Sequence, residues 1–432
     1  MKIIRLNNET RKDILETLSK RSHTGNDDYT KTVNEIIENV RTGGDSAVFD
    51  YTKKFDGADI NRDNFIVSEE EIDEAYSLVS DRLVEIIRHS ISNIKKYHEC
   101  QLRQSFFTTE DGIMLGQRIM PLETVGLYVP GGKAAYPSSV LMNVVPAKVA
   151  GVKCIQAATP VNREGKINPN TLVAAKEAGA DIIYKMGGAQ AIAAFAYGTD
   201  MVRKADKICG PGNIFVALAK RAVYGNVSID SIAGPSEILV LADETANARF
   251  VAADLLSQAE HDEMASAILV TTSQKLAEEV SKEVDGFVAA LSRKEIIQKS
   301  LDQFGYILVA DDMETAIATA NEIAPEHLEI ITVNPFETMT KIRNAGAIFL
   351  GEYSSEPLGD YFAGPNHVLP TNGTAKFFSP LGVDAFVKKS SIISYSREAL
   401  EPVYPDIVQF AECEQLTAHA NSIRVRFEDK KD

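Results

Sequence analysis

From residue 124 onward, the chain repeats one pattern: a short apolar run, a turn containing Gly or Pro, and a stretch with helical spacing of apolar residues. One series runs from TVGLYVPGG to NIFVALAKRAVYG, and a second runs from EILVLAD (237–243) to AIFLGEY (347–353). Strands that alternate with helices predict parallel sheets with helices on their faces. Because 432 residues exceed what one hydrophobic core usually holds, two packed units are expected. We therefore predict an α/β fold with two Rossmann-like parallel-sheet domains.

The segments around these two series are expected to form smaller parts. Residues 9–106 carry apolar side chains at helical spacing, which predicts helices. The run 353–382, rich in Gly, Pro, Ser and Asn, is longer than most unstructured loops, and such loops are usually functional or mobile. An amphipathic helix near 405–421 belongs to a short tail that should dock on the main body or on a second copy of the chain. We place the boundaries at 1–25 (helical extension), 26–125 with 237–381 (first domain), 126–236 (second domain) and 382–432 (C-terminal tail).

The charge balance argues against nucleic acid and membrane partners. The chain has 61 acidic and 45 basic side chains and a formal net charge of -16. Such a surface repels phosphate backbones and anionic membrane faces. The N-terminus lacks the apolar segment and cleavage site of a signal peptide, and no run approaches the roughly 18 apolar residues of a membrane span. We therefore expect a cytoplasmic protein.

The four cysteines, Cys100, Cys154, Cys209 and Cys413, lie far apart and include no CxxC pair. This spacing predicts neither a disulfide framework nor a thiolate zinc cluster. We expect three of them to be plain buried thiols. Cys209, in KICGPGN at a strand-to-turn junction, stands where a catalytic nucleophile could stand.

Seven histidines occur, and those in the polar helical N-terminal part are expected to be solvated and without a role: His23, His89 and His98. In DLLSQAEHDE, by contrast, Gln258 and His261 are three residues apart on an expected helix. Both side chains then leave the same face and can meet one ion.

Two further residues could complete a metal site. Asp360 lies in the long loop and His419 on the tail helix, and their O and N donors suit zinc or manganese. Alternatively, Gln258 and His261 form a solvated face, Asp360 caps a turn, and His419 is a surface residue. The residues by themselves leave both interpretations open.

An acid and an imidazole are adjacent in EIAPEHLEI. Pro325 disfavours the helical conformation at Ala324, so a helix should end there and Glu326 with His327 should open the next strand. On a regular strand the two side chains would face opposite sides, so an irregular backbone is needed if both serve one substrate. Such a pair can move protons near neutral pH.

The glycine-rich turns only partly match a dinucleotide-binding motif. GPGNIF (210–215) has Phe where the third glycine of GxGxxG would stand. Gly210 and Gly212 still lie between a strand and a helix, where free N–H groups and the helix dipole favour a phosphate, and MGGAQAIAAF (186–195) repeats the arrangement. The alternative is that these glycines only close tight turns.

Together, the motifs resemble those of the histidinol dehydrogenase family over nearly the whole chain. They follow in one order: VGLYVPGGKAAYPSSVLMNVVPAKVAG, GGAQAIAAFAYGT, ICGPGNIFV, IAGPSEILVLAD, DLLSQAEHD, APEHLEI, NAGAIFLG and GDYFAGPNHVLPT. Each piece is weak alone, but the joint set is highly specific.

The resemblance implies a role for each matching residue. The implied zinc ligands are Gln258, His261, Asp360 and His419. The implied acid/base pair is Glu326 and His327, and the implied NAD contacts are Tyr128, Gln190 and Asn213. The implied substrate contacts are Ser236, His367 and Glu414, together with Gln258, His261, His327, Asp360 and His419. The family also implies a domain-swapped homodimer, in which the tail carrying Glu414 and His419 reaches the partner's active site.

The implied reaction is the zinc-dependent, four-electron oxidation of L-histidinol to L-histidine through histidinaldehyde, the final step of histidine biosynthesis. It would use one Zn²⁺ per subunit and two NAD molecules in turn. We expect His327 to take the hydroxyl proton and Glu326 to activate water against the aldehyde.

Three other interpretations remain at this point. Cys209 or Cys154 could form a covalent thiohemiacetal with an aldehyde. The same Gln, His and Asp set could serve a metal-dependent hydrolase that binds no nicotinamide. A zinc-stabilised binding or assembly protein would use the metal for folding only.

Overall fold

The computed structural model describes residues 1–21, 26–131, 136–232 and 234–428. The chain forms two compact units: unit 1 comprises Met1–Gln101 and Leu122–Phe386, and unit 2 comprises Leu102–Pro121 and Val387–Asp432. Unit 1 contains two parallel sheets surrounded by helices, which confirms the predicted α/β fold class. None of the described helices is both long enough and apolar enough to cross a membrane.

The larger sheet of unit 1 has six parallel strands in the order β1-β11-β10-β9-β12-β13. Their bounds are β1 Lys2–Arg5, β9 Glu237–Ala242, β10 Ser266–Thr271, β11 Gly305–Val309, β12 His327–Ile331 and β13 Ala347–Leu350. Successive residues of a strand point to opposite faces. In β9, Ile238 and Val240 join one hydrophobic core and Leu239 and Leu241 join the other. The unbroken apolar runs in the sequence thus belong to strands buried on both faces.

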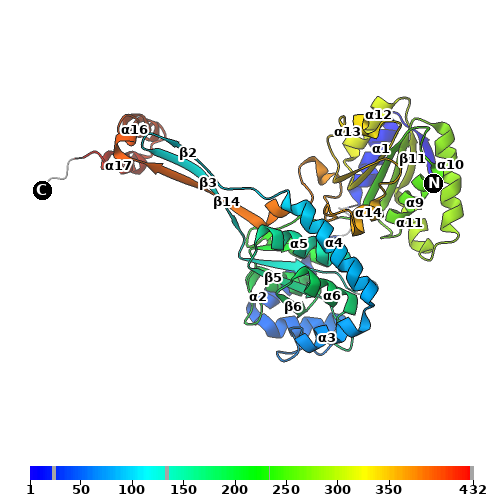
Figure 1. Cartoon of the computed structure of the whole chain (residues 1–432), viewed down its shortest axis with the longest axis horizontal. Helices are drawn as coiled ribbons and strands as arrows, with labels where there is room; N and C mark the ends of the chain where they lie inside the picture. Colours follow the sequence, from blue (N-terminus) through cyan, green and yellow to red (C-terminus); the bar gives the residue numbers. More distant parts are fainter. Residues whose placement is uncertain (22–25, 132–135, 233, 429–432) are drawn as a thin grey trace. The chain divides into compact units, whose positions relative to one another are not determined.

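Helices cover both faces of this sheet (Figure 1). The first core is closed by α9 Ala248–Ala259, α10 Gln274–Val288 and α11 Lys294–Phe304. The second is closed by α1 Asn8–Lys20, α12 Met313–Ile323 and α13 Pro335–Met339. The helical extension predicted for residues 1–25 contains α1, but it also begins with β1, which pairs in parallel with β11, with Lys2 opposite Tyr306; the segment therefore joins the six-stranded sheet.

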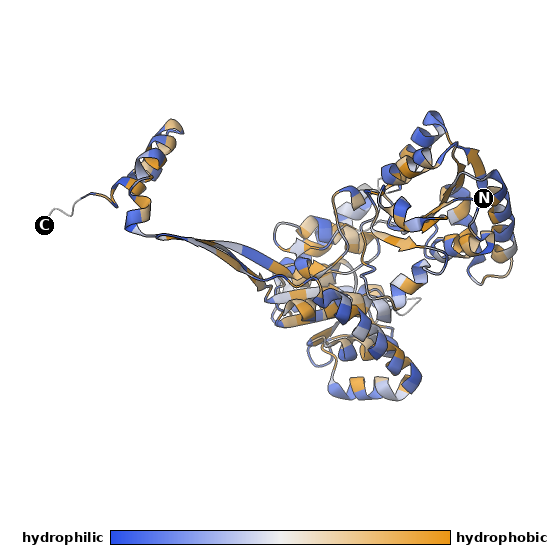
Figure 2. Ribbon diagram, turned by 45° about the horizontal axis from the view of Figure 1, so that its top comes forward, coloured by the Kyte–Doolittle hydropathy of each residue, from blue (hydrophilic) through white to orange (hydrophobic). Residues whose placement is uncertain are grey.

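The smaller sheet of unit 1 has five parallel strands in the order β6-β5-β4-β7-β8. Their bounds are β4 Thr124–Tyr128, β5 Cys154–Thr159, β6 Ile182–Lys185, β7 Lys207–Cys209 and β8 Ser228–Ile229. The connecting helices are α5 Pro137–Ala150, α6 Pro169–Ala178, α7 Gly188–Tyr197 and α8 Ile214–Val223. Most residues of α5 and α7 are buried, so these helices need covering on more than one side. Figure 2 shows hydrophobic segments inside unit 1 and hydrophilic ones on its outer helices.

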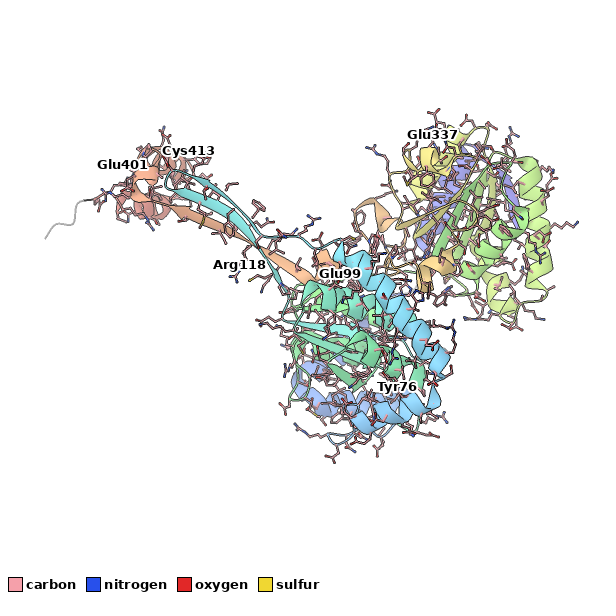
Figure 3. The ribbon with its side chains drawn as sticks, in the orientation of Figure 1. Tyr76, Glu99, Arg118, Glu337, Glu401 and Cys413 are labelled. Carbon is pink, nitrogen blue, oxygen red and sulfur yellow. The ribbon has the colours of Figure 1, made fainter. Side chains whose placement is uncertain are left out.

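Three N-terminal helices supply that cover: α2 Asn26–Asp56, α3 Glu69–Leu78 and α4 Asp81–Glu99. Helix α2 packs on α7 and α8, α3 packs on α6, and α4 packs on α5 and α6. Tyr76 of α3, labelled in Figure 3, donates to Glu177 Oε1 of α6 at 2.7 Å. The sequence predicts that residues 26–125 pack with 237–381. In the structure, α2, α3 and α4 instead pack on the helices of the five-stranded sheet, which corrects that grouping.

The long segment 353–382 is partly ordered by short helices, α14 (Glu356–Tyr361) and η1 (Thr374–Lys376), and η2 (Val383–Phe386) follows it. Ser90 Oγ and Asn93 Nδ2 of α4 donate to the carbonyl oxygens of Tyr361 and Phe362, both at 2.8 Å. These bonds tie the end of α14 to the N-terminal helices.

Unit 2 has an antiparallel sheet in the order β14-β3-β2, followed by three helices. Their bounds are β2 Phe106–Glu110, β3 Ile113–Pro121, β14 Val387–Tyr395, α15 Arg397–Leu400, α16 Tyr404–Cys413 and α17 Thr417–Arg424. The tail therefore begins at residue 387 rather than at the predicted 382. It also includes the β2–β3 hairpin, which the sequence predicts as part of the first domain. Among the described residues of unit 2, only Val408 and Ala420 are buried apolar side chains, whereas Ile393 and Phe410 are more than 70% exposed.

Candidate functional site

A pocket of about 420 Å³ lies in unit 1, between edges of the two parallel sheets. The carboxyl ends of β4 and β7 supply Tyr128 and the loop Gly210–Asn213, and this is the edge at which parallel sheets usually bind ligands. The six-stranded sheet contributes the opposite edge, because Ser236 precedes β9 and His327 begins β12. One wall therefore suits a cofactor, and the other carries titratable side chains.

Most of the predicted site residues come together in this pocket. Its lining includes Tyr128, Asn213, Ser236, Gln258, His261, Glu326, His327, Asp360 and His367. Gln190 is buried on α7 and is not part of the lining. Glu414 and His419 are exposed residues of unit 2, so their assignment to the site stays a prediction.

Three side chains in unit 1 could hold a metal ion: His261, Glu356 and Asp360. One ligand atom of each lies within 4.8 Å of those of the others. Helix α9 ends at Ala259, so His261 lies in the following turn, where its N–H donates to the Gln258 carbonyl at 3.2 Å. The turn still keeps both predicted ligands at the pocket, although they do not share a helix face.

The donor set fits a borderline divalent cation such as zinc. Gln258 Oε1 is buried and has no hydrogen-bond partner within the described part of the chain. Burial raises the pKa of Glu356 to about 8, with the Asp360 charge adding to it, and burial raises the pKa of Asp360 to about 6. Burial disfavours the charged form of both carboxylates, and a bound metal cation would favour it.

Glu356 was missed by the sequence reasoning. It precedes Asp360 by four residues in SSEPLGD, and this spacing places both carboxylates on one face of α14. Ser257 Oγ donates to Glu356 Oε2 at 2.9 Å, which holds the carboxylate beside α9. The four-residue spacing is visible in the sequence, but the surrounding Ser, Pro and Gly residues favour a loop there.

The Glu326–His327 pair stands where the sequence predicted, at the start of β12. Helix α12 ends at Ile323, and Ala324 takes a left-handed conformation (φ 52°) just before Pro325. Both side chains then reach the pocket and meet the first residue of β9. Glu326 Oε2 accepts from the Glu237 N–H at 2.9 Å, and His327 Nδ1–H donates to the Glu237 carbonyl at 3.0 Å.

His327 is arranged as a proton acceptor. Because a carbonyl can only accept, Nδ1 carries the proton and Nε2 presents its lone pair. Nε2 is buried, lacks a hydrogen-bond partner among the described residues, and lies 3.8 Å from Asp360 Oδ1. Burial lowers the pKa of His327 to about 3, which keeps the ring neutral, and burial raises the pKa of Glu326 well above its usual range.

His367 lies on the same side of the pocket as Asp360. Its Nδ1–H donates to the Asp360 carbonyl at 3.1 Å and lies 3.6 Å from Asp360 Oδ1. Burial lowers the pKa of His367 to about 4, so this ring is also neutral near pH 7. A neutral imidazole with a fixed tautomer can accept a hydrogen bond from a ligand through Nε2.

The cofactor wall is built around the Gly210–Asn213 loop. Gly210 has φ +114°, and a Cβ there would overlap the Tyr128 carbonyl oxygen, so only glycine fits. Asn213 Oδ1 accepts from the N–H groups of Phe215 and Val216 and caps α8. The Phe in place of a third glycine thus lies inside the helix, and the loop still brings α8's N-terminus to the pocket.

The cysteines do not reach the pocket. Cys209 is fully buried, does not line the pocket, and has a pKa raised by burial, and Cys154 is also buried. This weakens the covalent alternative. The expectation of three plain buried thiols is wrong for Cys100 and Cys413, which are exposed because they lie at or just after helix ends; Cys413 is labelled in Figure 3.

The N-terminal histidines differ from the expectation at one position. His98 is fully buried, and its Nδ1–H donates to the Ile94 carbonyl at 2.8 Å, so it is not solvated. His89 is exposed and packs edge-on against Phe362. His23 lies outside the described residues.

Comparison with known proteins agrees with this geometry. The sequence model of the histidinol dehydrogenase family matches residues 19–427. A histidinol dehydrogenase of Bacillus licheniformis is 59% identical over 411 residues, which cover 95% of this chain and 96% of that protein. One of Halalkalibacterium halodurans is 56% identical over 432 residues and the full length of both chains.

A solved structure gives the same result. The crystal structure of histidinol dehydrogenase from Elizabethkingia anophelis matches with a TM-score of 0.93 and 40% identity, and covers 99% of this chain and 98% of that one. The fold, the pocket and the sequence matches lead to one conclusion: the chain belongs to the histidinol dehydrogenase family.

Proposed function

We propose that the chain oxidises L-histidinol to L-histidine through histidinaldehyde, with zinc bound and two NAD molecules reduced in turn. The observation that carries the proposal is the pocket itself, in which a glycine loop of one sheet faces a metal-type donor set and the bare Nε2 of His327. We place this reaction at the final step of histidine biosynthesis, in the cytoplasm.

The metal would be held by Gln258, His261 and Asp360 of one chain, with Glu356 beside them and His419 of a second copy as a further ligand. When bound, zinc would hold nitrogen atoms of the substrate and so orient the alcohol carbon. The raised pKa values of Glu356 and Asp360 support this assignment, because burial disfavours the charged form of these neighbouring carboxylates and a bound cation would favour it.

The cofactor would lie against the Gly210–Asn213 loop, with Tyr128 and Asn213 in contact and Gln190 behind them. NAD, when bound, accepts the hydride. Burial raises the pKa of Tyr128 to about 12, so the hydroxyl stays protonated and available as a donor. Its oxygen already accepts the N–H of Gly188 at 3.1 Å, which ties it to the start of α7.

The chain's own residues then move the protons. His327 Nε2 takes the hydroxyl proton while the hydride leaves the alcohol carbon, and the resulting imidazolium faces the Asp360 carboxylate. Glu326, in its ionised form, takes a proton from the water that adds to the aldehyde, and its raised pKa makes the carboxylate a stronger base. Over both steps one water is consumed, two hydrides leave as NADH, and three protons are released. Ser236 and His367 line the pocket and are assigned to substrate contact.

We further propose that the chain acts as a homodimer with shared sites, one Zn²⁺ per subunit, and Glu414 of each tail in the partner's pocket. The exposed apolar side chains of unit 2, such as Phe106, Ile393 and Phe410, support its burial against another surface. Mixing an inactive His419→Ala chain with an inactive His261→Ala chain should restore part of the activity. No recovery after confirmed subunit exchange would contradict shared sites.

Chelation tests the metal assignment directly. The zinc-loaded protein mixed with histidinol and NAD should produce NADH, EDTA should stop this, and added zinc should restore it. Circular dichroism after EDTA distinguishes a metal used for catalysis, which leaves the fold intact, from one used only for assembly. NADH formation that is unaffected by complete zinc removal would overturn the zinc dependence.

A further inference from the structure

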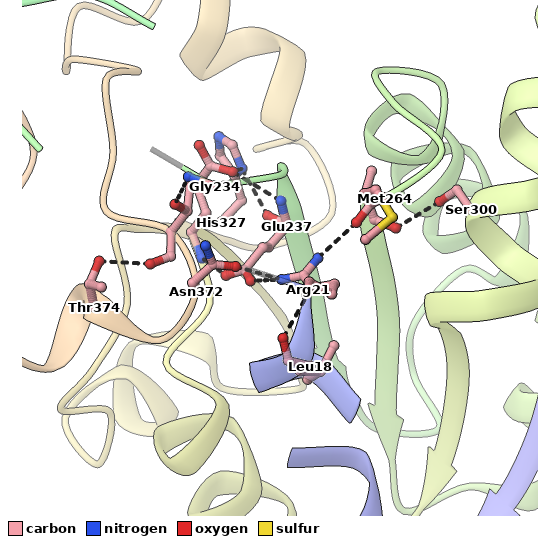
Figure 4. A network of polar contacts seen from close by, with 12 residues as sticks. Leu18, Arg21, Gly234, Glu237, Met264, Ser300, His327, Asn372 and Thr374 are labelled. Carbon is pink, nitrogen blue, oxygen red and sulfur yellow. Dashed lines mark hydrogen bonds and ion pairs between the residues drawn. The ribbon is translucent and has the colours of Figure 1, made fainter. Parts of the chain in front are cut away.

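A buried ion pair contacts the start of β12, where Glu326 and His327 lie, and Figure 4 shows it beside His327. It joins Arg21, which follows α1, to Glu237, the first residue of β9. The two side chains are 0% and 5% exposed. Removing two charges from water is costly and is offset only by good geometry and additional hydrogen bonds. Such a pair therefore needs a structural or functional reason.

Glu237 contacts both residues of the proposed acid/base pair. Its N–H donates to Glu326 Oε2 at 2.9 Å, and its Oε2 accepts from the Glu326 N–H at 3.3 Å. Its carbonyl accepts from His327 Nδ1–H at 3.0 Å. The start of β9 therefore sets the direction of the Glu326 carboxylate and the tautomer of His327 at once.

Arg21 fixes the start of β9 to other segments around the pocket. Its Nη1 donates to the Met264 carbonyl at 3.1 Å, in the turn that begins at His261, and its Nη2 also lies 3.4 Å from Asn372 Oδ1. The residue before Asn372, Thr371, accepts the Gly234 N–H at 2.7 Å. A planar guanidinium can serve several acceptors at fixed angles, which an ammonium cannot.

We propose that Arg21 and Glu237 are positioning residues for the reaction: the pair holds the start of β9, and through it Glu326 and His327, in the reactive geometry. This inference rests on the proposed function, in which these two residues move the protons. A misplacement of about 1 Å in a reacting group can cost about 10²-fold in rate. Burial raises the pKa of Glu237 and the Arg21 charge opposes this, so the two side chains depend on each other.

The test compares Arg21→Met and Arg21→Lys with a matched control on α1, the helix that Arg21 follows. Arg11 pairs with Glu322 of α12 at 3.3 Å, is partly exposed, and does not line the pocket, so Arg11→Met removes an ion pair of α1 without touching the site. We expect both Arg21 variants to lose about 10- to 100-fold in kcat per folded protein, with KM for NAD within about threefold. The Arg11 variant should keep its kcat.

A double variant separates positioning from stability. Arg21→Met alone leaves Glu237 buried without its partner, whereas Arg21→Met with Glu237→Met replaces both charges by apolar side chains and should recover the urea midpoint. Its kcat should stay low. Recovery of kcat together with stability, or a wild-type kcat in Arg21→Lys, would overturn the proposal.

Variants of the acid/base pair, Glu326→Gln and His327→Asn, are measured beside these. If these two variants lose turnover while Arg21→Lys keeps the wild-type kcat, the positioning role is rejected and the proposed function of the pair stands. If instead they turn over like the wild type, the proposed function of the pair fails, and the positioning role fails with it.

Discussion

Replacing Lys220 by Met should destabilise the cofactor wall of the pocket and weaken NAD binding selectively. The buried Lys220 ammonium pairs with Asp230 and donates to the Gly210 carbonyl at 3.0 Å. Asp230 in turn accepts from the N–H groups of Gly210 and Ser231, at 2.8 and 2.7 Å. Both backbone polar groups of Gly210 are therefore held by this one pair.

The magnitude follows from what remains after the change. Breaking a buried ion pair by removing one partner costs about 3–5 kcal/mol, and because Asp230 keeps two N–H donors we expect about 3 kcal/mol. Lys148→Met is the control, because its pair with Asp181 spans 2.9 Å with both side chains 37% exposed. Such a pair contributes about 0–1 kcal/mol. Urea unfolding of the two variants measures the difference.

The kinetic consequence should be confined to one substrate. If about 1.4–2.8 kcal/mol of the loss appears in the Gly210–Asn213 loop, which we propose to bind NAD, KM for NAD should rise about 10- to 100-fold. KM for histidinol should change less than about threefold, because the opposite wall is untouched. An unchanged urea midpoint, or equal rises in both KM values, would refute the reasoning.

Three further changes have definite expected outcomes. Burial raises the pKa of the half-buried Asp56 from 3.8 to about 6, so its charge costs stability that sets in above pH 3.8 and is complete above about pH 6. Asp56→Asn should therefore raise the free energy of unfolding, measured by urea titration, by about 1–2 kcal/mol at about pH 7.5 after allowance for its exposed part, and by much less at about pH 4; the reverse order would contradict this. Gly210→Ala should lower stability by about 2 kcal/mol or more in thermal melts, because its Cβ overlaps the Tyr128 carbonyl, and an unshifted melt would be inconsistent with that overlap. Cys209→Ala should keep turnover within about tenfold, whereas a loss beyond about 10³-fold would favour the covalent route.

The fold could be predicted because its signals are local. Strands buried on both faces appear as apolar runs, and β9 and β10 follow this pattern along their whole length. Pro325 likewise marked the end of α12 and the start of β12. These features depend only on neighbouring residues. The order in which the motifs occur along the chain also indicates the family.

The packing partners could not be predicted, because they depend on residues distant in sequence. Arg21 and Glu237 are 216 residues apart, and neither carries a pattern that names the other. The pairing of the β2–β3 hairpin with β14 of the tail could not be predicted for the same reason. In that pairing Gln117 of β3 lies opposite Ser391 of β14. Glu356 is the exception, since its spacing from Asp360 was visible in the sequence.

The most direct test of the account is the ratio of NADH formed to histidinol consumed by the zinc-loaded protein. The proposed reaction predicts two NADH for each histidinol, with histidine as the product. A ratio of one would mean that oxidation stops at the aldehyde, and no NADH with intact zinc would contradict the proposed oxidation itself.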